Sequence, residues 1–264
     1  MKVLSKKDFI YAFKKLGIKQ GMHLVVHSSL SRIGYLVNGP KDILDALSEI
    51  VNLKKGTIIL PTHSSQLSDP RQWARGGFSK AEKEKIRLNM SNFDKEFTLP
   101  SNRGILSNYI LNYKSAYRSN HPLNSFCGIG KSAKKILSQH SLLEPEGINS
   151  PLGKLYYNRG YILLIGVKLD KCSAIHLAEN IAGVKYLERS KVRILVKINN
   201  KKKFVVMKKY ATNSDKFNKL YKLPEIKNII KKININKISL NLISIYDLVN
   251  IVVKILKKKE NFFK

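Results

Sequence analysis

The chain has 264 residues, of which 43% are hydrophobic, 9% aromatic and 25% charged. This mixture excludes a disordered, collagen-like or low-complexity protein, and the length is enough to bury a sizeable core. The charge is unusual, because 49 Lys and Arg residues stand against 18 Asp and Glu, which gives a formal net charge of +31.

The excess positive charge has two interpretations. The chain is rich in Lys, Asn, Ile and Tyr, as an AT-rich coding sequence would be, and much of the Lys would then be solvated surface. Alternatively, the charge serves an anionic partner such as nucleic acid, acidic lipid or a phosphorylated ligand. The excess is densest in residues 185–264, but no RRM, KH, zinc-finger or bZIP signature accompanies it. We therefore rank nucleic-acid binding below a soluble enzyme.

Cysteine usage and apolar runs point to a cytoplasmic location. The two cysteines, Cys127 and Cys172, have no CxxC spacing, so we expect neither a metal site nor a disulfide scaffold. The chain contains no run of about 18 apolar residues that would predict a transmembrane helix, and residues 1–11 lack the apolar core of a secretory signal.

No repeat or Pro/Ser-rich linker divides the chain, so we expect one domain over residues 1–264. A homodimer is left open.

The first elements predict an α/β fold. Residues 5–16 form an amphipathic pattern with a serine cap, typical of a helix, and residues 22–27 form an apolar run typical of a buried strand. A second helix follows at 41–51 and a second buried strand at 57–61. This order predicts a layered sandwich in which a central mixed, largely parallel sheet is flanked by helices.

The later elements are interrupted by a long polar segment. Residues 64–100 are irregular, and a loop of this length inside a compact domain is usually functional. The patterns beyond it predict helices at 104–113, 131–139, 150–157 and 243–256, a central strand at 160–167, and a hairpin of two strands at 191–198 and 203–209 around Asn199-Asn200.

Polar residues follow the first predicted strand and lead into a helix: His27, Ser28, Ser29, Leu30, Arg32, Gly34 and Gly39. In open α/β sheets ligands bind beyond the carboxyl ends of the strands, where small residues and helix-start N–H groups can hold phosphate. The alternative is an ordinary strand–helix loop with a serine cap.

Two further polar segments are candidates. His63 follows the second buried strand and leads towards Asp69 and Trp73, although a histidine in this position is often simply a hydrogen-bonded polar residue. His121 and Ser125 belong to an Asn-His-Pro segment between apolar elements, which could equally be a turn.

The strongest constellation follows the strand at 160–167. Asp170, Cys172 and Ser173 precede His176 and Glu179, whose i, i+3 spacing puts both side chains on one helix face. A carboxylate that orients a histidine and stabilises its cation is the arrangement of a general base. The pair could also ligate a metal, but the spacing shows no third ligand. No GxSxG nucleophile motif is present.

These segments together resemble the aminoglycoside N3-acetyltransferase family, whose antibiotic N-acetyltransferase fold is distinct from that of the GNAT enzymes. The resemblance rests on HSSLSRIGYLVNGP, ILPTHS, SNHPLNSFCGIGKSA, NSPLGKLYYNRGYILLIGV and CSAIHLAEN, which occur in the order of the family. It extends from about residue 5 to the last predicted helix.

The resemblance implies that an acetyl group moves from acetyl-CoA to an amine of a sugar, without a metal. It places His176 at the reaction centre as the base, with Glu179 orienting it or binding the acceptor. It also implies that residues 27–39, with His121 and Ser125, meet acetyl-CoA, and that the acceptor side contains His63, Asp69, Trp73, Asp170 and Ser173. Direct transfer needs no cysteine, so we interpret Cys172 as incidental.

The net charge bears on the acceptor. An aminoglycoside is a polycation, and a chain of +31 would slow its approach. We therefore favour a nucleotide-linked amino sugar of surface-polysaccharide biosynthesis, with aminoglycoside resistance as the alternative. The rivals from other classes are a nucleic-acid-associated protein and a metal-dependent hydrolase that uses His63, His121, His176 and Glu179.

Overall fold

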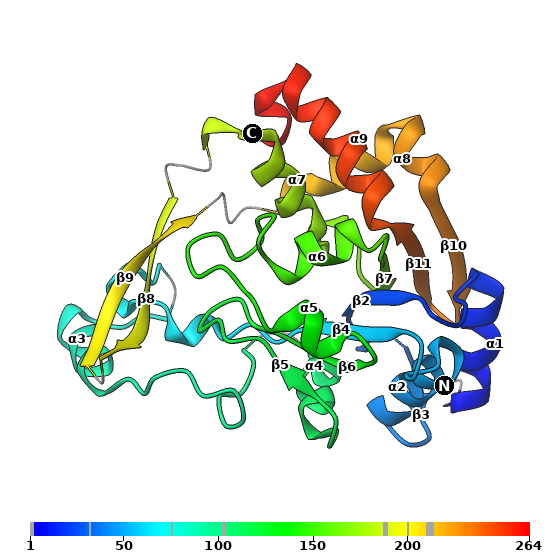
Figure 1. Cartoon of the computed structure of the whole chain (residues 1–264), viewed down its shortest axis with the longest axis horizontal. Coiled ribbons are helices and arrows are strands. Elements are labelled where there is room, and N and C mark those ends of the chain that lie inside the picture. Colours follow the sequence, from blue (N-terminus) through cyan, green and yellow to red (C-terminus); the bar gives the residue numbers. More distant parts are fainter. Residues whose placement is uncertain are drawn as a thin grey trace.

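The computed structural model describes residues 3–31, 33–74, 76–101, 104–186, 190–199, 201–209 and 214–264. A seven-stranded sheet with the order β10-β11-β7-β2-β4-β6-β5 forms its centre (Figure 1). The strands are β2 His23–Ser28, β4 Thr57–Pro61, β5 Tyr117–Arg118, β6 Phe126–Gly130, β7 Tyr161–Ile165, β10 Ile230–Ile235 and β11 Ile238–Ser244.

The mixed α/β sheet is confirmed, but its parallel part is smaller than the sequence predicts. Within the seven-stranded sheet, the two parallel pairings are those of β2 with β4 on one side and with β7 on the other. The four remaining pairings, β10–β11, β11–β7, β4–β6 and β5–β6, are antiparallel. The sequence analysis found the three parallel strands because they are buried on both faces and therefore continuously apolar.

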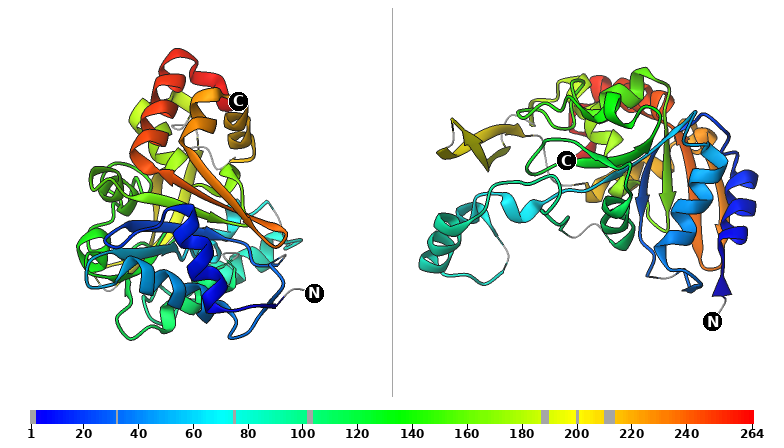
Figure 2. Two further views of the ribbon diagram at one scale, coloured as in Figure 1. Left: turned by 90° about the vertical axis from the view of Figure 1, so that its right-hand side faces the viewer. Right: turned by 60° about the horizontal axis from the view of Figure 1, so that its bottom comes forward.

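Helices cover both faces of the sheet (Figure 2). One face packs against α1 Lys6–Leu16, α2 Pro40–Val51 and α4 Ile105–Tyr109. The other packs against α5 Ala133–Leu137, α6 Pro151–Tyr157, α7 Ala174–Ala182, α8 Pro224–Ile229 and α9 Ile245–Lys258. Alternation along β2 divides the core, since Val25 belongs to the second cluster while Leu24 and Val26 belong to the first.

Short segments complete the fold. Two two-residue strands, β1 Val3–Leu4 and β3 Tyr35–Leu36, pair in parallel beside the main sheet. Single-turn and longer 3-10 helices lie at η1 Ser65–Leu67, η2 Pro70–Gln72, η3 Ile110–Asn112, η4 Leu169–Lys171, η6 Asp215–Lys222 and η7 Glu260–Phe263. In the described part of the chain no helix is long and apolar enough to cross a membrane.

The predicted helix that begins after Ser5 is confirmed, and residues recognisable in the sequence cap both of its ends. Ser5 precedes α1, and its backbone N–H donates to the Asp8 carboxylate at 2.8 Å. Hydrogen bonds from Ser5 hold the pKa of Asp8 below its usual value. Gly17 ends the helix at φ 98°, a conformation that glycine adopts without strain. The last predicted helix begins two residues late, at Ile245, because Ile243 and Ser244 complete β11.

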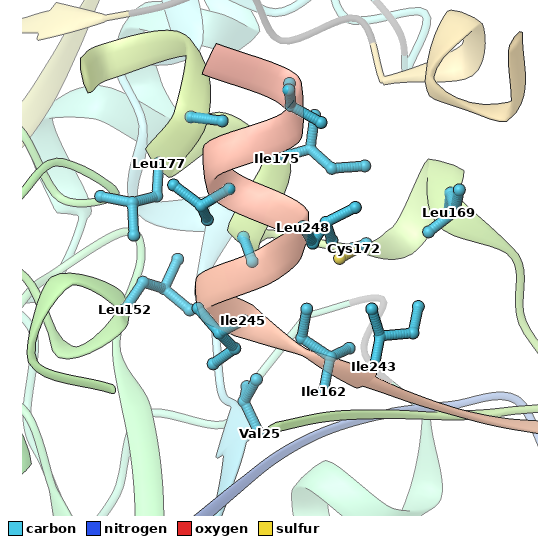
Figure 3. Close-up of a cluster of buried hydrophobic side chains, with 14 of the residues drawn as sticks. Val25, Leu152, Ile162, Leu169, Cys172, Ile175, Leu177, Ile243, Ile245 and Leu248 are labelled. Atoms are coloured by element: carbon cyan, nitrogen blue, oxygen red, sulfur yellow. The ribbon is translucent and has the colours of Figure 1, made fainter. Parts of the chain in front are cut away.

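Helices α7 and α9 pack together over the sheet in a cluster of buried hydrophobic side chains (Figure 3). Ile175 and Leu177 of α7, Leu248 of α9 and Ile162 of β7 all belong to this cluster, with Ile175 on the same side of α9 as Leu248. Each buried side chain of this size contributes about 1.5–3 kcal/mol, so the cluster fixes α7 firmly on the sheet. The chain that carries His176 and Glu179 is therefore anchored by the apolar side of the same helix.

The predicted hairpin is present as β8 Ser190–Ile198 and β9 Lys201–Lys209. Its turn contains Asn199 at φ 48°, whereas Asn200 lies outside the described residues. One face of the hairpin packs Ile194 on Leu123, and the other packs Leu195 on Leu67. The hairpin therefore lies between two segments that are distant in sequence, at one end of the molecule (Figure 1).

The prediction of an irregular segment over 64–100 is wrong at residues 80–89, which form the helix α3 Lys80–Asn89. The Ser79 hydroxyl accepts the N–H of Glu82, and the Glu82 carboxylate accepts the N–H of Ser79. None of the residues of α3 is buried, so the helix has no apolar periodicity that could predict it. The capping box formed by Ser79 and Glu82 is the sequence signal that marks its start.

Candidate active site

Two neighbouring cavities lie beyond the carboxyl ends of the parallel strands. The His176 cavity has a volume of about 360 Å³ and is lined by residues that include His63, Asp170, Ser173 and His176. The Ser28 cavity has a volume of about 560 Å³ and is lined by residues that include Ser28, Pro61 and Val167. Lys171 lines both cavities, so the two spaces adjoin at this residue.

The ends of β2 and β7 approach closely at this edge of the sheet. The Ser29 N–H donates to the Ile165 carbonyl at 2.9 Å. Gly166 follows at φ 67°, and a Cβ on it would lie 2.5 Å from the Ser29 carbonyl oxygen. Only glycine fits here, because a side chain would both clash with backbone and adopt a strained conformation. The Gly-Val pair that ends the predicted strand thus shapes the Ser28 cavity.

His176 and Glu179 form a hydrogen-bonded pair on α7, as their spacing predicts. The His176 Nδ1 and Glu179 Oε2 atoms are 2.7 Å apart. The Glu179 side chain is 1% exposed, whereas that of His176 is 13% exposed and reaches the cavity. A carboxylate on Nδ1 fixes the tautomer and the orientation of the ring, so that Nε2 is the nitrogen suited to take a proton.

The pair is enclosed by aromatic side chains. The Tyr186 hydroxyl donates to Glu179 Oε1 at 2.7 Å, so both carboxylate oxygens are hydrogen-bonded. The Phe217 ring meets His176 edge-on, with centroids 4.9 Å apart, and Phe263 packs behind Phe217 at 4.7 Å. The Phe217 ring and the Glu179 carboxylate together restrict rotation of the imidazole.

Neither cysteine has the properties of a nucleophile, although Cys172 is among the residues that line the His176 cavity. The Cys172 sulfur points into the apolar cluster of α7 and α9 (Figure 3). Burial raises the pKa of Cys172 to about 12, and burial likewise raises the pKa of Cys127 to about 12. A thiol rather than a thiolate is a poor nucleophile, which agrees with the interpretation of Cys172 as incidental.

The His176 cavity is acidic relative to the whole chain. Its described lining contains the carboxylates of Glu146 and Asp170 and the ammonium group of Lys171. With histidines neutral, two negative charges and one positive charge give −1, against +31 for the chain. Lys171 is paired with Asp170 at 3.1 Å, but its side chain is 56% exposed, so this ion pair is weak.

Sequence reasoning missed Glu146, which is 4% exposed and accepts a hydrogen bond from the Asn124 amide at 3.2 Å. It lies in a loop between helices with no apolar pattern around it, and only the folded chain brings it to the cavity. Lys171 was also missed, because one lysine among many has no distinguishing signal in the sequence.

Four of the predicted cofactor residues line the Ser28 cavity: His27, Ser28, Ser29 and Leu30. Arg32 lies outside the described residues. The structure places Gly34 and Gly39 elsewhere, since neither belongs to the lining of a cavity described here. Gly39 instead precedes α2 at φ 63°, where it makes the turn into the helix. The serine-rich stretch, not the glycines, faces the space.

His121 and Ser125 do not line either cavity, and their contact with acetyl-CoA stays a prediction. His121 Nδ1 accepts the backbone N–H groups of Leu123 and Asn124, so this segment is a turn held by its histidine. The Ser125 hydroxyl donates to the Thr62 carbonyl at 2.7 Å and accepts from the buried Arg118 guanidinium. Both residues are fully buried because they anchor the loops around the site.

Asp69 and Trp73 are not among the residues that line the His176 cavity, and their contact with the acceptor stays a prediction. The Asp69 side chain is fully buried, accepts the Arg71 N–H at 3.1 Å, and is paired with Arg87 at 3.3 Å. The Trp73 indole N–H donates to the Ser68 hydroxyl at 2.8 Å, and Ser68 lines the His176 cavity. The remaining predicted residues on this side, His63, Asp170 and Ser173, do line it.

No group of three or more His, Cys, Asp and Glu side chains within the described ranges is arranged to hold a metal ion. His63 and His176 share a cavity, while His121 is buried in its turn, so the ligand set of the hydrolase alternative is not assembled.

Comparison with known proteins identifies the family. A family model for aminoglycoside 3-N-acetyltransferases matches residues 25–257. The chain belongs to this family. It is 39% identical over 177 residues to the SPbeta prophage-derived aminoglycoside N(3')-acetyltransferase-like protein YokD of Bacillus subtilis (strain 168), a match that covers 66% of this chain and 64% of YokD.

Other members of the family are similar to smaller degrees. Over 177 residues the chain is 29% identical to aminoglycoside N(3)-acetyltransferase IX of Micromonospora chalcea, covering 64% of this chain and 59% of that enzyme. The chain thus spans less than two thirds of the length of these two curated relatives.

Solved structures extend the likeness over nearly the whole chain. The crystal structure of YokD from Bacillus subtilis superposes with a TM-score of 0.91 at 29% identity, covering 99% of this chain and 96% of that one. A binary complex of AAC-IIIb with CoASH superposes with a TM-score of 0.83 at 21% identity, covering 98% of each chain. The second likeness is one of fold alone.

Proposed function

We propose that this chain is an N-acetyltransferase that moves the acetyl group of acetyl-CoA directly to an amine of an aminoglycoside. The observation that carries the proposal is the hydrogen-bonded His176–Glu179 pair, which borders a polar cavity adjoining the Ser28 cavity. Family membership supplies the reaction class, and the family is named for aminoglycosides.

The chemistry needs a base at this place. An alkylammonium group is not a nucleophile until it loses a proton, and a histidine can take that proton near neutral pH. His176 Nε2 accepts the proton as the amine nitrogen attacks the thioester carbonyl carbon. The C–S bond then breaks, and the CoA sulfur leaves as thiolate or thiol. Glu179 stabilises the imidazolium that forms.

Each of the two cavities receives one of the two substrates. The Ser28 cavity receives the acetyl-CoA thioester arm, and what supports a CoA site in this fold is that AAC-IIIb, a protein with the same fold, forms a binary complex with CoASH. The His176 cavity receives the acceptor, whose ammonium groups are attracted by Glu146 and Asp170. A local acidic cavity thus offsets the long-range repulsion between a polycation and a chain of +31.

A second acceptor class is favoured by one observation. Lys171 lines both cavities and would attract a phosphate near the acceptor, as a nucleotide-linked amino sugar of surface-polysaccharide biosynthesis would supply. The comparisons favour the aminoglycoside, so the nucleotide-linked sugar is the second candidate.

The experiment measures release of free CoA thiol from acetyl-CoA with a panel of acceptors. Kanamycin- and gentamicin-type compounds form one arm, and nucleotide-linked amino sugars form the other. Rapid turnover with an aminoglycoside supports the proposal. Turnover with only the nucleotide-linked sugars would replace it with the second candidate, and no turnover with any amine would contradict both.

A further inference from the structure

We propose that Tyr186 is a positioning residue that sets the proton affinity of His176, a role that rests on the function proposed above. The Tyr186 hydroxyl donates to Glu179 Oε1, and Glu179 Oε2 meets His176 Nδ1, each at 2.7 Å. The three side chains form a continuous chain of hydrogen bonds from the protein interior to the His176 cavity.

The direction of these hydrogen bonds follows from burial and charge. An ionised carboxylate only accepts, so the phenol donates to one oxygen of Glu179 and the imidazole N–H donates to the other. Burial, together with the neighbouring Glu179 charge, raises the pKa of the Tyr186 phenol. Tyr186 therefore keeps its proton throughout the neutral pH range and remains a donor.

The phenol affects the imidazole through the carboxylate. A hydrogen bond to Oε1 draws negative charge towards that oxygen, so Glu179 stabilises the His176 imidazolium less than a carboxylate with one oxygen unsatisfied would. The phenol also prevents the buried carboxylate from turning, which keeps Oε2 on Nδ1 and leaves Nε2 towards the acceptor. Both effects favour a neutral, correctly oriented imidazole before reaction.

Other charged groups lie near this chain of hydrogen bonds. From η7 and the residue that follows it, Glu260 accepts the Lys185 N–H at 2.5 Å, and the Lys264 ammonium lies 5.3 Å from the centre of the Tyr186 ring. From η6, Asp215 and Lys216 precede the ring of Phe217, which contacts His176. The cavity itself presents the titratable and charged side chains of His63, Glu146, Asp170 and Lys171.

The decisive variant is Tyr186→Phe in the full chain. We expect kcat to fall about tenfold, as loss of one charge-assisted hydrogen bond predicts, with the KM for acetyl-CoA unchanged. The acidic limb of the pH–kcat/KM profile should move up by about half to one pH unit, because the imidazolium becomes better stabilised.

The matched control is Tyr113→Phe. The Tyr113 hydroxyl also donates to a carboxylate, Asp45 Oδ1 of α2, at 2.9 Å, but neither residue lines the His176 cavity. This variant loses the same kind of hydrogen bond, so it reports the structural cost alone. Its pH profile should match that of the unmodified chain.

A second measurement does not depend on turnover. NMR titration of the His176 imidazole, assigned by comparison with His176→Gln, should show a higher pKa in Tyr186→Phe than in the unmodified chain. Tyr186→Gln, which keeps an N–H donor, is the reserve variant if Tyr186→Phe does not fold, and its shift should have the same sign and be smaller.

The outcomes separate the two proposals. If the unmodified chain acetylates none of the acceptors, the proposed function fails, while the NMR titration still decides the role of Tyr186. If the chain is active but Tyr186→Phe changes neither the pH profile nor the imidazole titration, the role of Tyr186 is overturned. Loss of activity in step with loss of folded protein, with an unchanged titration, would also overturn it.

Discussion

The residues around the two cavities fall into those that face the space and those that hold the facing residues in place. His176 and Ser28 face it, whereas Ser125 and Asp69 are engaged with backbone and guanidinium groups behind it. Residue type alone does not separate these roles, because both sets consist of His, Ser and Asp. Whether a side chain faces a cavity or supports it from behind depends on the path of the loop that carries it.

The placement of acetyl-CoA in the Ser28 cavity is testable by filling that space. We expect Ser28→Trp to weaken acetyl-CoA binding by at least about tenfold, because an indole occupies volume the thioester arm needs, a cost of about 1.4 kcal/mol or more. Isothermal titration calorimetry measures the effect. The control is Ser65→Trp, which places the same side chain in the His176 cavity instead and should leave acetyl-CoA affinity unchanged. Normal affinity in Ser28→Trp would place the cofactor elsewhere.

At the scale of elements, the three parallel strands create the site by ending at one edge of the sheet. Close approach of β2 and β7 there depends on Gly166, whose Cβ would meet the Ser29 carbonyl oxygen. Helix α7 then starts beyond η4 and directs His176 back over this edge, while α9 fixes its apolar side.

The requirement for glycine can be separated from backbone strain. Gly77 has φ 65°, close to the φ 67° of Gly166, but a Cβ on Gly77 would meet nothing within 4 Å. We expect Gly77→Ala to cost about 1 kcal/mol from strain alone, and Gly166→Ala to cost about 1–3 kcal/mol more from the clash. Urea unfolding measures both free energies. Equal losses would show that the strand ends separate at little cost.

The sequence predicts those elements whose signal is local. Buried parallel strands and capped helices such as α1 were found within a residue or two, and so was the i, i+3 pair on α7. The strands β5, β6, β10 and β11 were missed; β6 contains two glycines, and β10, at an edge of the sheet, contains two consecutive lysines. The acidic cavity was missed as well, since Glu146 reaches it only through tertiary packing.

The whole molecule combines a strongly positive surface with a cavity of opposite sign. The charges of the surface and those of the cavity respond differently to salt, because exposed charges are screened strongly while buried charges are screened less. Under the proposed function, we expect the net charge to govern how substrates approach and the cavity to govern which of them remain bound.

This contrast predicts opposite salt dependences for the two substrates. Between about 0.02 and 0.5 M salt, the KM for acetyl-CoA should rise, since attraction between the CoA phosphates and the positive surface is screened. Over the same range, the KM for a polycationic aminoglycoside should first fall as repulsion is screened. Initial rates at fixed pH measure both. Parallel changes in the two KM values would show that net charge has no part in approach.

The central claim, that His176 takes the proton of the acceptor amine, is tested most directly by His176→Ala. The measurement pairs single-turnover acetylation with acetyl-CoA affinity, and His23→Ala, at the opposite end of β2, is the control. We expect the rate to fall about 10²–10⁴-fold with acetyl-CoA still bound, the range for loss of a general base. A rate equal to that of the unmodified chain would contradict the account.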